Sequence, residues 1–339
     1  MNNGLPSISV VIPTLNSERA LDRCLESVDR QDYPRDRIEV IIVDAGSMDG
    51  TLETARRHKV DKVLPNPLRT GEAGKVVGID ASTREIVALI DSDNVLDGTD
   101  WLRRMVKPFE NPQICSSEPL YWTYRREDSV IDRYCALTGV NDPLCLFLGN
   151  YDRYSYLSGK WTCMRVKEEI DRGDYLEVVI DKDSVPTMGA NGYLVRRDVL
   201  KTVDYHPYYF DIDVVYQLVQ MGHDRIARPK TGIIHLYCDG VGLFHRKQKR
   251  RIDDYFYFKK SGMRQYKYDL RSTGYASYIV STVLVLPLIY QSVRGYARKR
   301  DTAWFFHPLA CWITLVAYGS STIKGMFRAR MQDRSRWSQ

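Results

Sequence analysis

The chain has 339 residues, of which 44% are hydrophobic and 27% charged, so it can hold one large domain plus an appendage. Its net charge of +6 is modest and no nucleic-acid-binding motif is visible, so we expect no nucleic-acid partner. Seven cysteines, an odd number without paired or metal-type spacing, argue against a disulfide framework and favour reduced thiols in a cytosol-facing protein. Because a core strand begins almost at the N-terminus, we also expect no signal peptide.

The first ninety residues alternate between apolar runs and stretches with helical periodicity. A β-branched run stops at Pro13, and apolar residues then recur with helical spacing behind Asn16 or Ser17 as the N-cap. A second apolar run ends in Asp44 and leads through an Asp-Gly turn into another helix. This alternation predicts an α/β fold with a parallel sheet and right-handed crossovers. The predicted strands are 7–12, 39–43 and 63–64. One predicted helix begins after Ser17, a second ends near His58, and a third covers 73–82.

A fourth apolar run, at 87–90, ends in two carboxylates, Asp91 and Asp93. Side chains two apart share a face of a strand, so both carboxylates should aim at one volume beyond the strand end. Open α/β sheets bind their ligands there, and two hard oxygen ligands suit a Mg²⁺ or Mn²⁺ that carries a diphosphate. The same spacing recurs at 181–183 and 211–213, but neither of these follows a clean apolar strand.

A dinucleotide-binding dehydrogenase would show a similar alternation, but its first turn should read Gly-x-Gly-x-x-Gly. The corresponding residues 13–18 contain no glycine, which disfavours that class. The segments together closely resemble the family 2 glycosyltransferases, inverting enzymes of the GT-A fold. Two departures are Val76, where many relatives carry a polar residue, and Phe210, where the commoner residue is Glu. The matching segments are 10–16, 43–51, 78–81, 91–93, 189–192 and 210–213.

The resemblance implies a site for a UDP- or GDP-sugar in the first 115 residues. Asp44 would hydrogen-bond the edge of the base, and Asp93 would bind Mg²⁺ or Mn²⁺ directly. Lys75 would meet the base or the diphosphate, with a solvated helix lysine as the alternative. Asp49 would hold the loop around the pocket, or serve only as a turn residue. The remaining implied donor-site residues are Pro13, Thr14 and Asn16 on the pocket floor, Ser47 in the loop, Asp91 near the ribose or metal, and Ser92.

The resemblance places the catalytic base at Asp211. Apolar spacing predicts a helix from Asp211 to about Gly222, so this carboxylate lies in the first turn, where the helix dipole favours it. An inverting transfer needs one base to take the proton of the acceptor hydroxyl. A simple N-cap is the alternative for Asp211, and Asp213 is expected to be a support or a cap.

Two further candidates lie downstream. The run Gly232–His235 reads as a strand ending in histidine, which could complete the metal shell or be a structural residue. A basic run follows at 246–251, either as a surface or as a clamp on the donor diphosphate. Arg246 is the residue of this run that we place nearest the site.

Two uncharged apolar segments, Tyr275–Val293 and Ala303–Ile323, are each about long enough to span a bilayer. Basic clusters at 246–271, 294–300 and 324–336 surround them and predict attraction to an anionic membrane surface. A spanning hairpin would translocate one basic cluster, whereas two in-plane helices would keep every cluster on the cytoplasmic face. The alternative without a membrane is a helical pair buried in a homo-oligomer.

These observations lead to one expected organisation. Residues 1–245 form a GT-A catalytic domain, with a donor half at 1–115 and an acceptor half at 116–245. A basic linker at 246–274, two membrane-associated helices at 275–327 and a basic tail at 328–339 follow.

The expected function is metal-dependent inverting transfer from a UDP- or GDP-sugar to a hydroxyl of a lipid-linked glycan or polyprenyl carrier, at the cytoplasmic face of the membrane. A sugar-phosphate nucleotidyltransferase is the enzymatic alternative, but its glycine-rich basic loop after the first strand is absent. A non-catalytic membrane scaffold is the other alternative, and the intact carboxylates argue against it. Aromatic residues between 118 and 185 suit either an acceptor surface or ordinary core packing.

Overall fold

The structure is a computed structural model that describes residues 4–266 and 273–327, with side chains described as far as residue 323. Contacts divide the described chain into two compact units. The first contains residues 4–121 and 165–235, and the second contains residues 122–164, 236–266 and 273–327. Each unit is built differently, the first around a sheet and the second from helices.

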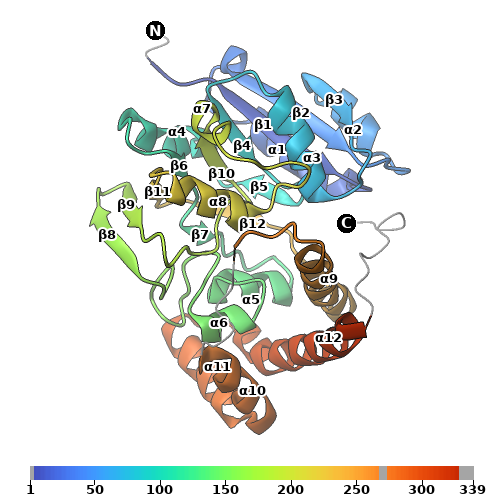
Figure 1. The fold of residues 1–339 in the computed structure, drawn as a ribbon, viewed down its shortest axis with the longest axis vertical. Helices are drawn as coiled ribbons and strands as arrows, with labels where there is room; N and C mark the ends of the chain where they lie inside the picture. Colours follow the sequence, from blue (N-terminus) through green and yellow to red (C-terminus); the bar gives the residue numbers. More distant parts are fainter. Residues whose placement is uncertain (1–3, 267–272, 328–339) are drawn as a thin grey trace. The chain divides into compact units, whose positions relative to one another are not determined.

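A nine-stranded mixed sheet forms the centre of the first unit (Figure 1). Its strand order is β3-β2-β1-β4-β10-β6-β11-β9-β8. The strands are β1 (Ile8–Thr14), β2 (Ile38–Asp44), β3 (Lys62–Pro65), β4 (Ile86–Leu89), β6 (Ser116–Ser117), β8 (Val166–Asp171), β9 (Tyr175–Ile180), β10 (Tyr193–Arg196) and β11 (Arg225–Pro229).

The four N-terminal strands run parallel, as predicted. Every residue of β2 and β4 is buried, which explains why these strands read as continuous apolar runs and not as alternating ones. Strand β10 then pairs antiparallel with β4, and Tyr193 lies opposite Leu89. This pairing brings the residues before β10 beside the residues that follow β4.

The helices of the first unit confirm most of the sequence predictions. Helix α1 begins after Ser17, α2 ends before His58, and α8 ends before Met221. In α8 the predicted stripe of Ile212, Val215, Leu218 and Val219 is buried. The helices are α1 (Glu18–Asp29), α2 (Thr51–Arg57), α3 (Gly71–Ala81), α4 (Trp101–Val106), α7 (Arg197–Leu200) and α8 (Asp211–Gln220), with 3₁₀ turns at η1 (Arg35–Arg37) and η2 (Lys107–Glu110).

A second, smaller sheet includes β5 (Asn94–Leu96) and β12 (Gly232–His235). The two strands pair antiparallel, with His235 opposite Asn94. The strand predicted to end in histidine is therefore present, and its partner begins one residue after Asp93. The chain passes to the second unit at the short strand β7 (Tyr121–Trp122).

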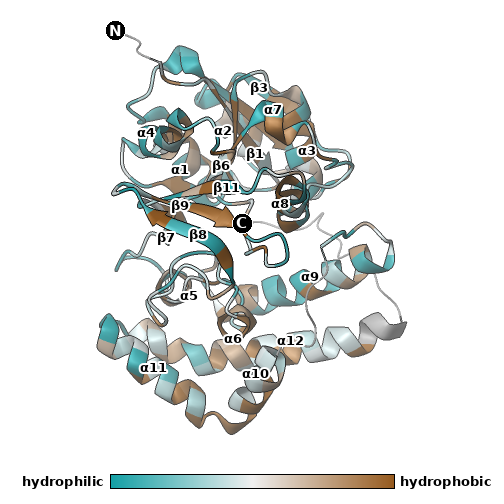
Figure 2. Ribbon diagram, turned by 60° about the vertical axis from the view of Figure 1, so that its left-hand side comes forward, coloured by the Kyte–Doolittle hydropathy of each residue, from teal (hydrophilic) through white to brown (hydrophobic). Residues whose placement is uncertain are grey.

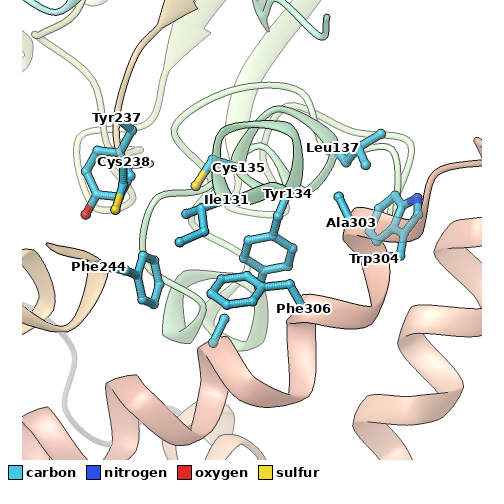
Figure 3. Packing of buried hydrophobic residues seen from close by; sticks show 11 residues of the cluster. Ile131, Tyr134, Cys135, Leu137, Tyr237, Cys238, Phe244, Ala303, Trp304 and Phe306 are labelled. Atoms are coloured by element: carbon cyan, nitrogen blue, oxygen red, sulfur yellow. The ribbon is translucent and has the colours of Figure 1, made fainter. Parts of the chain in front are cut away.

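The second unit has a core built around the buried face of a short helix (Figure 3). Tyr134 contacts Phe306 edge-on, and Phe306 in turn contacts Phe244. These three rings come from α5, η3 and α9, so residues far apart in the sequence share one core. The elements are α5 (Val130–Thr138), α6 (Leu144–Leu148), α9 (Val241–Lys260), α10 (Thr273–Leu284), α11 (Leu286–Arg298), η3 (Thr302–Phe306) and α12 (His307–Phe327).

The division into units differs from the expected organisation. We expected residues 1–245 to form one domain, but residues 122–164 belong with the C-terminal helices, because Ile131 and Tyr134 share one core cluster with Trp304 and Phe306. Much of the expected linker at 246–274 is the helix α9, whose Phe244 and Phe258 are buried. The expected basic tail at 328–339 lies outside the described residues.

The first apolar segment is broken into two helices, which the sequence analysis missed. Val285 adopts φ 63°, and Pro287 stands in the first turn of α11. Proline has no N–H and its ring clashes with the carbonyl four residues earlier, so α10 cannot continue through it. The signal was present in the sequence as Leu286-Pro287.

Among the described residues, no helix taken alone has the length and composition needed to cross a bilayer. Helices α10 and α11 have the required length and composition only when taken together, and they are bent by 95° relative to each other. Figure 2 shows the hydrophobic colouring of their junction. Leu284 and Leu286 at this junction are 60% and 74% exposed.

Candidate functional site

The loops that follow β1 and β2 are tied together by side chains. Asn16 has φ 48°, its backbone N–H donates to Ser47 Oγ at 2.8 Å, and its Oδ1 accepts from the N–H of Met48 at 2.8 Å. Asp44 Oδ1 accepts from Thr14 Oγ1, and Asp44 Oδ2 accepts from the N–H of Gly46 and Ser47. The predicted pocket-floor residues therefore meet at the carboxyl edge of the parallel strands.

Asp49 holds the loop around this edge, as predicted. Its carboxylate accepts from the N–H groups of Glu18 and Thr51 and from Thr51 Oγ1. Those hydrogen bonds lower the pKa of Asp49, although partial burial acts in the opposite direction. The carboxylate thus fastens the start of α2 to the start of α1.

The two carboxylates after β4 do not share a strand face, which corrects the sequence argument. Strand β4 ends at Leu89, and a tight turn follows, in which the N–H of Asn94 donates to the carbonyl of Asp91 at 2.9 Å. Asp91 lies 3.8 Å from Lys75 Nζ, whereas Asp93 lies 3.5 Å from His235 Nε2. The i, i+2 spacing was interpreted as the end of a strand, but it belongs to a turn in which the two side chains contact different partners.

Asp93 and His235 fit a shared cation. Two ligands bound at about 2.1 Å and at tetrahedral or octahedral angles lie about 3–3.5 Å apart. The 3.5 Å between Asp93 Oδ2 and His235 Nε2 is at the wide end of this range. Among the described residues, no group of three or more His, Cys, Asp or Glu side chains could hold a metal ion by itself. Further ligands would have to come from a diphosphate or water.

Lys75 lies between two carboxylates and not in solvent. Its ammonium donates to Asp211 Oδ1 at 2.9 Å and lies 5.7 Å from the centre of the Tyr209 ring. The N–H of Tyr209 donates to the carbonyl of Glu72, which fastens the segment before α8 to the first turn of α3. The structure therefore excludes a solvated lysine. Lys75 instead forms an ion pair with Asp211, the predicted catalytic base.

Asp211, the predicted catalytic base, is a partly exposed carboxylate with a raised pKa. Burial raises the pKa of Asp211 to about 6, while the charge of Lys75 acts to lower it. The side chain nevertheless keeps 38% of its surface exposed, so an acceptor can reach it. Burial alone would lower the pKa of Lys75, but Asp211 and Asp91 outweigh it and the pKa of Lys75 is raised.

The other candidate residues are less informative. Pro13 is half-buried at the end of β1, and Ser92 Oγ donates to Ser17 Oγ at 3.2 Å. Asp213 is buried, in keeping with a supporting role. Arg246 is exposed on α9 in the second unit.

The sequence analysis missed a buried ion pair near these residues. Glu118 and Arg228 are both fully buried and contact each other directly. Glu118 follows β6 and Arg228 lies in β11, and the two strands run side by side although about a hundred residues separate them in the sequence. No local pattern could have identified this pair.

Comparisons with known proteins agree with the sequence motifs. Residues 9–123 match the family model described as Glycosyl transferase family 2, which confirms the resemblance over this region. The chain is 30% identical over 146 residues to Glycosyltransferase AglE of Haloferax volcanii, a match that covers 41% of this chain and 48% of AglE. It is also 38% identical over 60 residues to a dolichyl N-acetyl-alpha-D-glucosaminyl phosphate 3-beta-D-2,3-diacetamido-2,3-dideoxy-beta-D-glucuronosyltransferase of Methanococcus voltae, covering 16% of this chain and 19% of that protein.

A solved structure shares the fold more completely. The mannosyltransferase PcManGT of Pyrobaculum calidifontis, solved in complex with GDP-Man and Mn²⁺, matches with a TM-score of 0.54 and 17% identity. The match covers 96% of this chain and 88% of PcManGT. It confirms the α/β fold with a large central sheet as that of GT-A glycosyltransferases. This chain spans about half the length of AglE and less of the Methanococcus protein.

Proposed function

We propose that this chain is an inverting glycosyltransferase that transfers a sugar from a UDP- or GDP-sugar with the help of a divalent cation. The observation that carries the proposal is the position of Asp211, a carboxylate in a segment of the family motif that is 38% exposed and lies 2.9 Å from the buried ammonium of Lys75. The raised pKa of Asp211, about 6, accords with this role. The match of residues 9–123 to the family model and the ligands named for PcManGT support the donor class and the cation.

In the proposed reaction the acceptor oxygen attacks the anomeric carbon while the bond from that carbon to the diphosphate breaks. Asp211 takes the proton of the acceptor hydroxyl, and the nucleoside diphosphate leaves with the bonding electrons. Lys75 holds Asp211 in place through its 2.9 Å contact, and its positive charge favours the ionised form of Asp211. The loops that are joined by the hydrogen bonds of Asn16, Asp44 and Ser47 would hold the nucleoside.

Asp93 and His235 are the residues that would hold Mg²⁺ or Mn²⁺. A bound cation would neutralise the charge that develops on the departing diphosphate. We assign no direct metal contact to Asp91, because it lies beside Lys75 in this structure.

We further propose that the acceptor is lipid-linked and that the enzyme works at the cytoplasmic face of a membrane. The name of the Methanococcus relative includes a dolichyl phosphate acceptor. In this chain, the exposed apolar residues of α10 and α11 and the exposed arginines Arg294 and Arg300 would suit such a surface.

The decisive experiment compares Asp211→Asn with Asp213→Asn. Nucleoside diphosphate release from a panel of UDP- and GDP-sugars would be measured with Mn²⁺ and with synthetic dolichyl N-acetylglucosaminyl phosphate as acceptor. We expect Asp211→Asn to keep its melting temperature and its stabilisation by UDP or GDP, while turnover falls roughly 10²–10⁴-fold. A normal rate in Asp211→Asn together with a folded but inactive Asp213→Asn would show that Asp213, and not Asp211, is the base.

A third variant tests the cation assignment separately. Asp93→Ala should lose the part of the nucleotide-induced stabilisation that depends on Mn²⁺, because the cation would join the diphosphate to the protein. Equal stabilisation with and without Mn²⁺ in the unmodified protein would contradict metal dependence. That result would not bear on Asp211, whose role is tested by the turnover of Asp211→Asn.

A further inference from the structure

The buried ion pair of Glu118 and Arg228 is costly for a protein that gains little stability from it. Both side chains have 0% exposure. Removing two charges from water costs several kcal/mol for each ion, and well-packed apolar replacements are often as stable or more so. Stability alone therefore does not explain why two charges are buried at this point of the fold.

Glu118 has a second set of contacts that does explain it. Its Oε1 accepts from the N–H of Gly189 at 3.0 Å and from the N–H of Ala190 at 3.3 Å. Its other oxygen faces Arg228, which holds the carboxylate in one orientation. One carboxylate thus fixes two successive amides of the loop before β10.

This loop contacts the base directly. Gly189 has φ 110°, and a Cβ added there would lie 2.8 Å from the carbonyl oxygen of Asp211. The backbone of the loop is therefore packed against the first residue of α8. A shift of the loop by a few tenths of an ångström has to be taken up by Asp211 or its neighbours.

The same loop also reaches the cation-side carboxylate. Asn191 has φ 53°, and its Oδ1 accepts from Asn94 Nδ2 at 3.1 Å. The same amide of Asn94 lies 3.3 Å from Asp93 Oδ1. Contacts therefore run from Glu118 through the loop to Asp93 on one side and to Asp211 on the other.

We propose that Glu118 and Arg228 are positioning residues that hold the 189–191 loop so that Asp93 and Asp211 keep their relative places. This role rests on the function proposed above, because it matters only if Asp93 and Asp211 act in the same reaction. The pair touches neither donor nor acceptor in this assignment. It acts only through the two amides of the loop.

Two double variants separate positioning from simple stabilisation. Glu118→Gln/Arg228→Gln removes both charges but keeps a carbonyl oxygen for the amides of Gly189 and Ala190. Glu118→Met/Arg228→Met removes both charges and the acceptor. We expect the Gln pair to retain turnover within about threefold, and the Met pair to lose roughly 10- to 100-fold in kcat with a smaller change in donor KM, since misplacement of reacting groups by about 1 Å costs this much.

Hydrogen exchange at the amides of Gly189 and Ala190 provides a readout that needs no activity. Protection should fall in the Met pair and persist in the Gln pair, while amides of β2 stay protected in both. Equal protection in the two variants, or equal kcat in two folded variants, would overturn the proposal. An unmodified enzyme without transferase activity would instead count against the proposed function, and the exchange result would still decide whether Glu118 fixes the loop.

Discussion

Asp211 and Lys75 form a pair in which each residue changes the protonation of the other. As the proposed catalytic base, Asp211 must be ionised to accept a proton, and burial raises its pKa to about 6. Lys75 opposes that rise, because a positive charge 2.9 Å away favours the carboxylate form. The lysine therefore sets the lowest pH at which the base is available.

This pairing predicts the pH dependence of the reaction. On the acid side, kcat/KM should fall about tenfold per pH unit below pH ~6, as Asp211 becomes protonated. In Lys75→Met the opposing charge is lost, so the pKa of Asp211 rises and the acid limb moves to higher pH. Lys75→Arg keeps the charge and should leave the limb near its original position. An unshifted limb in an active Lys75→Met enzyme would show that another group controls it.

The helix α3 presents a second kind of constraint, set by close packing. An added Cβ on Gly78 would lie 2.2 Å from Val11 Cγ1, so the helix can approach β1 only because this residue has no side chain. Glycine inside a helix normally costs about 1 kcal/mol relative to alanine. Its presence here shows that the approach of α3 to β1 outweighs helix propensity.

We predict that Gly78→Ala destabilises the protein by about 1–3 kcal/mol, the usual cost of overpacking. Gly71→Ala is the matched control in the same helix, because a Cβ there meets no atom within 4 Å. The midpoint of urea unfolding would be compared for both variants. Adding Val11→Ala to Gly78→Ala should restore part of the loss, whereas a Gly78→Ala protein as stable as the control would refute the packing argument.

The elements differ in how far they could be predicted from the sequence. Strands β1, β2 and β4 were predicted because buried parallel strands contain continuous apolar runs. The turn at Asp91–Asn94 was missed because a turn and a strand end share the same short polar pattern. The Glu118–Arg228 pair could not be predicted, since it depends on the pairing of β6 with β11.

At the scale of the whole molecule, exposed apolar residues of the second unit gather where α10 meets α11. Val283, Leu284, Leu286 and Tyr290 are all more than half exposed around the junction of α10 and α11. The two helices are bent by 95° relative to each other. Such a bent pair would enter one leaflet without crossing it, and Arg294 and Arg300 would remain at the headgroups.

Removing the C-terminal helices is a poor test of this proposal, because Trp304, Phe306 and Ala310 belong to the core that contains Tyr134 (Figure 3). Truncation before residue 273 would unfold part of the second unit and confuse loss of binding with loss of structure. Point substitutions at exposed positions avoid this difficulty.

We therefore predict that Leu284→Glu/Leu286→Glu abolishes binding to vesicles of phosphatidylcholine and phosphatidylglycerol, because a carboxylate resists burial among acyl chains. The matched control is Val63→Glu/Leu68→Glu, which changes two residues that are 46% and 44% exposed in the first unit and should bind normally.

The unmodified protein should remain on the vesicles in high salt, because salt screens the arginines but not apolar burial. Arg294→Gln/Arg300→Gln should weaken binding only at low salt. Unmodified protein that stays in the supernatant at both salt concentrations would refute membrane binding. Equal loss in both glutamate variants would show that added negative charge, not the α10–α11 junction, is responsible.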